Sequence, residues 1–124
     1  MKKLKKSQSI TINIILMTQL KPSQIYFTHT KLSNKFTGCG KELVETLHEL
    51  IDGTISIDSI PKIKVYYYDT GKEIKYLSEN NRRLWVFKQL ESNGLIDEIS
   101  VRLEKTTNPR YLTNSYSLNA KIIG

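Results

Sequence analysis

The sequence predicts a small α+β domain built on a mixed sheet with two main helices. Two segments carry apolar residues at helical spacing, and short segments rich in β-branched and aromatic residues lie around them. Their order along the chain is strand, helix, hairpin, helix, strand, which is typical of this class. The 124 residues fit one domain, and a content of 39% apolar and 25% charged residues argues against a wholly disordered chain.

We expect residues 1–21 to form a basic, flexible N-terminal tail. Such a tail can hold nucleic-acid phosphates without sequence preference, and it is equally typical of a solvated chain end. The folded domain is expected over residues 22–124, with a C-terminal extension from about residue 105. Four lysines of the tail supply +4 of the net charge of +7: Lys2, Lys3, Lys5 and Lys6.

The first half of the domain is expected to contain a strand, a helix and a hairpin. Residues 25–28 have strand propensity. Residues 41–51 place leucine, valine and isoleucine at helical spacing, and Gly53 is positioned to end that helix. Residues 62–68 are β-branched and aromatic, and a turn then returns the chain in a strand over residues 73–77.

A second helix is expected over about residues 81–92, followed by a strand over residues 99–103. Asn93 and Gly94 stop the helix, and Asn80 or Asn81 would cap its beginning. Polar residues 104–110 resemble a turn, and residues 111–123 could add a short strand. The apolar stripe of the helix consists of Leu84, Phe87 and Leu90.

Two asparagines and two arginines meet at the expected start of the second helix: Asn80, Asn81, Arg82 and Arg83. Free backbone N–H groups and the positive end of the helix dipole point toward that place. Two guanidinium groups beside them make a plausible site for an anion such as phosphate. The alternative is that one arginine pairs with a carboxylate and Asn81 only caps the helix.

The strand over residues 62–68 carries three consecutive tyrosines among lysines. Strand alternation puts Tyr66 and Tyr68 on one face and Tyr67 on the other. Basic strands with exposed tyrosines can bind single-stranded nucleic acid by stacking, whereas a half-buried surface strand has the same pattern. The basic residues that could face DNA are Lys62, Lys64, Lys72, Lys75 and Arg110.

The chain offers little for metal or cofactor chemistry. Its single cysteine, Cys39, excludes an internal disulfide and a cysteine-built zinc site. His48 lies at helical spacing with carboxylates, which more often marks a solvated helix face than a metal site. No apolar run approaches the roughly 20 residues that cross a bilayer. We therefore expect no metal, no cofactor and no membrane association.

The segment ENNRRLWVFKQLESNG, preceded by an apolar strand and followed by IDEISVRL, resembles the ParB N-terminal and sulfiredoxin-like fold family. In that family a strand leads into a G-E-R-R or G-G-C-H-R turn that starts a helix. Residues 42–51 with Gly53 resemble its earlier helix, and residues 60–65 resemble its PPIxV strand. The resemblance covers roughly residues 23–103 and is specific around residues 80–87.

The resemblance implies a protein without catalytic activity. It places Asn81 where sulfiredoxins carry their catalytic cysteine, and an amide cannot replace a thiolate nucleophile. Cys39 precedes the first helix instead of the second, so we do not expect it to be catalytic. ParB proteins hold nucleotide phosphates in the G-E-R-R turn. Here both arginines remain, but Asn80 and Asn81 replace the glycine and the acid.

Four strings resemble a eukaryotic branch of this fold that includes a small accessory subunit of the ciliate DNA adenine methyltransferase complex: FTGCGKELVETLHELIDG, SIPKIKVYYY, NNRRLWVFKQL and SYSLNAKI. This resemblance implies a nuclear, non-catalytic subunit that binds other protein subunits of a DNA methyltransferase complex and reaches DNA through its basic residues. One alternative is a switch or phosphotransferase that binds ATP or CTP with the same arginines. Another is a purely structural interaction module.

Overall fold

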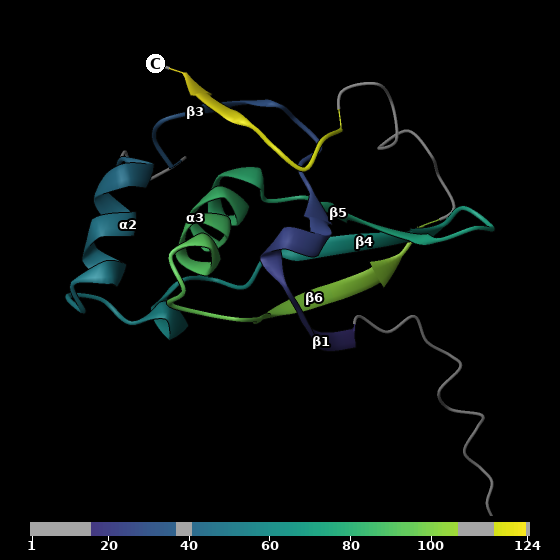
Figure 1. Ribbon diagram of the computed structural model, residues 1–124, viewed down its shortest axis with the longest axis horizontal. Coiled ribbons are helices and arrows are strands. Elements are labelled where there is room, and N and C mark those ends of the chain that lie inside the picture. Colours follow the sequence, from purple (N-terminus) through teal and green to yellow (C-terminus); the bar gives the residue numbers. More distant parts are fainter. Residues whose placement is uncertain (1–15, 37–40, 107–115, 124) are drawn as a thin grey trace, which may run out of the picture.

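A five-stranded mixed sheet forms the centre of the domain (Figure 1). The computed structural model describes residues 16–36, 41–106 and 116–123. The β1–β6 and β4–β5 pairs are antiparallel, whereas the β4–β6 and β2–β5 pairs are parallel. The strand order is β1-β6-β4-β5-β2, with β1 at Leu16–Leu20, β2 at Ile25–Tyr26, β4 at Lys64–Asp69, β5 at Ile74–Ser78 and β6 at Ile99–Lys105.

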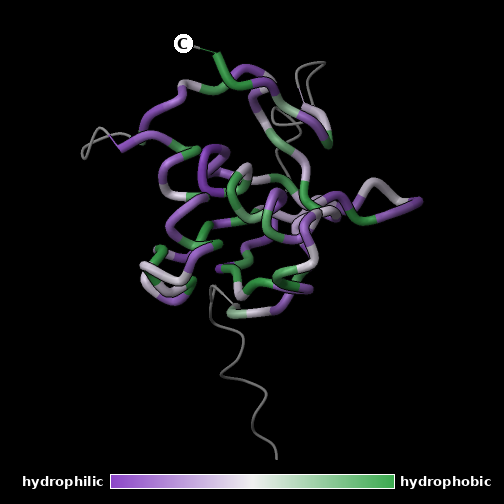
Figure 2. Tube along the Cα trace, turned by 60° about the vertical axis from the view of Figure 1, so that its left-hand side comes forward, coloured by the Kyte–Doolittle hydropathy of each residue, from purple (hydrophilic) through white to green (hydrophobic). Residues whose placement is uncertain are grey.

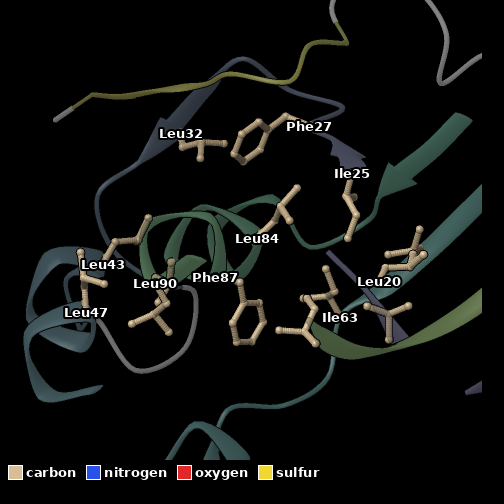
Figure 3. Close-up of a cluster of buried hydrophobic side chains, with 14 residues drawn as sticks. Leu20, Ile25, Phe27, Leu32, Leu43, Leu47, Ile63, Leu84, Phe87 and Leu90 are labelled. Atoms are coloured by element: carbon tan, nitrogen blue, oxygen red, sulfur yellow. The ribbon is translucent and has the colours of Figure 1, made fainter. Parts of the chain in front are cut away.

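Two α-helices, α2 (Leu43–Ile51) and α3 (Asn81–Ser92), lie on the same side of this sheet (Figure 1). Figure 3 shows Leu84 and Phe87 of α3 beside sheet-side residues such as Ile63, while Leu90 points toward Leu43 and Leu47 of α2. All of these side chains are buried. The predicted α+β class, with a mixed sheet and two helices, is confirmed.

A second, two-stranded sheet fastens the C-terminal segment to the domain. It pairs β3 (Lys31–Ser33) with β7 (Lys121–Ile123) in parallel. Next to it, Phe27 and Ser117 form a bridge in which each backbone N–H donates to the other residue's carbonyl oxygen, at 2.7 and 3.0 Å. Because β3 also contacts α3, this small sheet covers the start of that helix.

The predicted second helix is confirmed, since α3 begins at Asn81 and ends at Ser92. Gly94, which follows it, has a φ of 75° and terminates it as expected. The β4–β5 hairpin is also confirmed. The backbone N–H of Gly71 donates to the Asp69 carboxylate at 2.8 Å in its turn. Figure 2 shows this hydrophilic tip projecting from the domain.

Two expectations about the remaining segments need correction, and one strand was not predicted. The prediction of a flexible tail over residues 1–21 is wrong for residues 16–20, which form β1 and pair with the edge of β6. The Gln19 side chain also donates a hydrogen bond to the Ser100 hydroxyl at 2.8 Å. Residues 104–105 extend β6 beyond the predicted strand, whereas their polarity suggests a turn. Lys31–Ser33 forms a strand that local sequence does not reveal. Residues 1–15 lie outside the described residues.

Neither described α-helix is long and apolar enough to span a membrane. On α2, His48 and Glu45 are exposed, and Lys41 pairs with Glu49. Among the residues that the structure describes, no group of three or more histidine, cysteine, aspartate and glutamate side chains is arranged to hold a metal ion.

Candidate anion-binding site

A polar pocket of about 500 Å³ opens at the beginning of α3, and we call it the α3 pocket. β5 delivers the chain to this place at Ser78, and α3 starts three residues later. β3 passes on the other side, so segments from both halves of the domain form the walls. The lining residues are His29, Lys31, Leu32, Ser33, Phe36, Glu79, Asn80, Asn81, Arg82 and Arg83.

Asn80 occupies the N-cap position of α3, but its side chain does not cap the helix. Its amide oxygen instead accepts a hydrogen bond from the backbone N–H of Lys64 at 2.8 Å. Its own backbone N–H donates to the Ser78 hydroxyl at 2.9 Å. The predicted capping role is therefore wrong for Asn80, because its amide oxygen accepts from the backbone N–H at the start of β4 instead of from an N–H of α3. Asn80 fixes the start of α3 relative to β4.

Asn81 is almost fully buried and binds Thr28 at two points. Its amide oxygen accepts from the Thr28 backbone N–H, and its amide nitrogen donates to the Thr28 hydroxyl, both at 2.9 Å. That hydroxyl donates in turn to the Ser78 carbonyl oxygen at 2.9 Å. Both ends of the amide are thus engaged within the protein, so Asn81 serves to hold the pocket walls together.

Arg82 and Arg83 lie in the first turn of α3, where the sequence predicts them, and each binds a different loop. Arg82 Nη1 donates to the carbonyl oxygen of Lys35 at 3.0 Å. Arg83 Nη1 donates to the carbonyl oxygens of Pro61 and Lys62 at 2.7 and 3.0 Å. Arg83 has no acid within ion-pair distance among the described residues, so a simple pair of Arg83 with a carboxylate is not supported.

The guanidinium of Arg83 still has donors to offer. Both of its hydrogen bonds use Nη1, whereas a guanidinium carries five N–H donors on three nitrogens. Burial lowers the pKa of Arg83, and the nearby charge of Arg102 lowers it further. Arginine remains charged despite such a shift. A partly desolvated guanidinium near another cation is an environment that an incoming anion would stabilise.

The charges around the α3 pocket favour an anion. Among the described residues that line it, three side chains are cationic, Lys31, Arg82 and Arg83, against the one carboxylate of Glu79. Lys31 and His29 reach the pocket through β3 and the residues before it. Sequence reasoning missed them because no local pattern reveals that β3 passes the start of α3.

The lysines that the sequence proposes as DNA-facing do not line the α3 pocket. Lys64 pairs with Glu104 at 3.1 Å, and this contact raises the pKa of Lys64. Lys75 donates to the Tyr26 hydroxyl at 3.1 Å and pairs with Glu73 at 3.0 Å, and both contacts raise the pKa of Lys75. Lys62 is exposed before β4, and Lys72 is exposed at the hairpin tip. Arg110, Cys39 and the tail lysines lie outside the described residues.

A second cavity of about 480 Å³ adjoins the α3 pocket and has a more apolar lining. Phe36 and Arg83 line both cavities. The remaining walls come from Lys41 before α2, from α2 itself and from the connection between α2 and β4; the last two contribute Thr46, Ile55, Ser59, Ile60 and Pro61. A cationic cavity and an apolar cavity therefore meet at Arg83.

Comparisons with known proteins add no relative to this description: no family model, no curated protein and no solved structure matches the chain.

Proposed function

We propose that this chain is a non-catalytic accessory subunit of a nuclear DNA-modifying complex, of the DNA adenine methyltransferase kind, and that the α3 pocket binds DNA phosphate. The observation that carries the proposal is the position of Arg82 and Arg83 in the first turn of α3, in a pocket with three cations and one carboxylate. The ParB/sulfiredoxin-like family, which the sequence resembles, holds phosphate at such a strand–turn–helix junction.

The role of Asn81 supports a function without catalysis. The resemblance aligns Asn81 with the catalytic cysteine of sulfiredoxins, and here its amide bonds Thr28 through both oxygen and nitrogen. A thiol at this position could not make this pair of hydrogen bonds, because sulfur is only a weak donor and acceptor. The residue is thus adapted to hold two segments together.

DNA binding should be tested by removing both pocket arginines. Arg82→Ala combined with Arg83→Ala should weaken duplex binding by the purified complex and make it less dependent on salt. Each lost phosphate contact lowers the slope of log K against log salt by about 0.9. Lys72→Ala, which removes one exposed cation far from the pocket, is the control. Equal binding by the double variant throughout a salt titration would contradict the proposed DNA role.

The partner should be tested by affinity purification of the tagged full chain from native nuclear extract. We expect a DNA adenine methyltransferase subunit to co-purify and to remain bound after nuclease treatment, since the proposal requires contact with protein. A preparation that contains no methyltransferase subunit would count against the accessory role, even if DNA binding were intact.

A nucleotide-binding switch or phosphotransferase is the second candidate, and the adjoining cavities favour it. The α3 pocket could hold the phosphates of ATP or CTP, and the apolar cavity beyond Phe36 could hold the base. Calorimetry with each nucleotide and Mg²⁺ separates the two functions. Heat of binding at millimolar nucleotide would favour a nucleotide-binding function. No heat at that concentration would exclude it.

A further inference from the structure

The second face of the five-stranded sheet is not covered by either α-helix, because α2 and α3 lie on the other side (Figure 1). Strand register decides which residues share this face. Met17, Arg102 and Lys64 form one row across β1, β6 and β4. Glu104, Tyr66, Leu77 and Tyr26 form the next row, across β6, β4, β5 and β2. Tyr68 and Lys75 form a third. We call this surface the tyrosine face.

Apart from Glu104 at one end, the middle row of the tyrosine face is apolar and aromatic. Leu77 lies in register between Tyr66 and Tyr26 and is fully buried, although it is not part of the main core cluster. The two rings on its flanks therefore shield it from water, while each ring is itself only half-buried. Tyr116 contacts Tyr26 edge-on, with ring centroids 5.2 Å apart, and extends the aromatic surface.

Cations stand on both sides of the aromatic row. Lys64 Nζ lies 5.1 Å from the centroid of the Tyr66 ring, and Lys75 Nζ lies 4.8 Å from that of Tyr26. Residues that face the same side of a strand are about 7 Å apart along it, so the cationic rows lie one such step from the rings. Arg102 is exposed and has no acid within ion-pair distance among the described residues.

We infer that the tyrosine face binds single-stranded nucleic acid, with unpaired bases stacked on Tyr66, Tyr68 and Tyr26 and with phosphates beside Lys64, Lys75 and Arg102. Every nucleobase has a flat π-face, and a positive surface that carries aromatic rings is the usual platform for unpaired strands. A duplex keeps its bases inside the stack and cannot offer them to a sheet face. The inference goes beyond the proposed function, which assigns duplex phosphate to the α3 pocket.

An acidic peptide is a less suitable occupant of this surface. Lys64 and Lys75 pair with Glu104 and Glu73, so phosphate and carboxylate alike would have to displace these partners. The tyrosines distinguish the two ligands, because stacking contributes to binding bases but adds little for aspartate or glutamate side chains. The positive charge is needed in both cases, whereas the rings are needed only for bases.

The test measures anisotropy of labelled dT and rU oligonucleotides, and of a DNA duplex of equal length, on the full chain. Tyr66→Leu, which keeps an apolar cover over Leu77, should weaken single-strand binding roughly 5–150-fold, as expected for one lost base stack. Tyr66→Phe, which keeps the ring, should bind like the parent chain, and Tyr67→Phe is the control on the core face. Single-strand affinity unchanged in a folded Tyr66→Leu variant would overturn the inference.

Two further measurements keep this inference separate from the proposed function. If Tyr66→Leu does not fold, Arg102→Glu on the same face takes its place and must weaken single-strand binding. Arg82→Ala with Arg83→Ala should reduce duplex binding and leave single-strand affinity within about twofold. Equal losses for duplex and single strand in Tyr66→Leu, or competition by polyglutamate as strong as by dT, would refute base stacking.

Discussion

Asn81 and Thr28 are joined by two hydrogen bonds, although they lie 53 residues apart in the chain. The pair connects the first turn of α3 to the segment between β2 and β3. The Thr28 hydroxyl also donates a hydrogen bond to the carbonyl oxygen of Ser78, at the end of β5. The α3 pocket owes its shape to this connection, because β3 and the start of α3 form opposite walls of the same cavity.

The Asn81–Thr28 pair should contribute measurably to stability. Asn81→Ala leaves the part-buried backbone N–H of Thr28 without its acceptor and removes one donor to the Thr28 hydroxyl, so we expect the free energy of unfolding to fall by about 1–3 kcal/mol. Urea unfolding of Asn81→Ala, Thr28→Ala and the double variant measures the coupling, which should be about 0.5–3 kcal/mol. Asn119→Ala, at an exposed site, is the control. Additive effects of the two substitutions would contradict the paired arrangement.

The α3 pocket should recognise a small polyanion in the absence of DNA. Pyrophosphate at ten times its Kd would stabilise the folded chain by about 1.4 kcal/mol, which thermal unfolding detects as a higher Tm. We expect this increase in the parent chain and not in the variant carrying both Arg82→Ala and Arg83→Ala. Sodium chloride at equal ionic strength corrects for screening. The same increase in both proteins would place the anion elsewhere.

Lys88 should make stability depend on pH in the alkaline range. Burial lowers its pKa from 10.5 to about 8, and Glu91 opposes this shift only in part. Between these two values the unfolded chain holds a proton that the folded chain has released, so this group makes stability rise with pH there. Below about pH 8, Lys88 is protonated in both the folded and the unfolded chain, and its partly buried charge lowers the free energy of unfolding.

We therefore expect Lys88→Met to be more stable than the parent chain at pH 7, and the difference to shrink as the pH rises from 8 to 10.5. The Nζ atom of Lys88 lies 5.2 Å from the centroid of the Phe27 ring, a contact that a methionine side chain can still cover. Denaturant unfolding at several pH values measures the difference. Lys72→Met, at the exposed hairpin tip, should show no such trend.

Gly94 should be needed for its backbone conformation alone. Its φ is 75°, and a Cβ atom added there would meet nothing within 4 Å. Gly94→Ala should therefore destabilise the chain by about 1–2 kcal/mol through the left-handed conformation, without a steric clash. Gly94→Asn should cost less, because asparagine tolerates this region better. Thermal unfolding measures the Tm of both variants, and equal Tm values for Gly94→Ala and Gly94→Asn would contradict this explanation.

Local patterns predicted the parts of the fold that depend on nearby residues. The α3 boundaries follow from its apolar stripe and from Gly94, and the β4–β5 hairpin follows from a turn between two β-rich segments. The same holds for the tyrosines, since alternation alone puts Tyr66 and Tyr68 on one face, as the register has them.

What the sequence could not reveal depends on partners far along the chain. β1 falls within the predicted basic tail because Thr18 and Gln19 interrupt a mildly apolar segment, and its strand pairing depends on the edge of β6. β3 is three residues long, and its pairing with β7 brings Lys31 to the α3 pocket. Local sequence predicts a helix cap at Asn80, because nothing nearby in the chain shows that its amide oxygen accepts from the distant backbone N–H of Lys64.

The parallel pairing of β3 with β7 has a consequence for synthesis of the chain. Lys31 leaves the ribosome long before Lys121, its partner in register. At translation rates of roughly 5–20 residues per second, the interval is on the order of ten seconds. During that time β3, which forms one wall of the α3 pocket, lacks its partner strand β7. A nascent chain can therefore complete α2, the hairpin and α3 before β3 is paired, and premature termination would release a domain in which this wall of the α3 pocket is still unpaired.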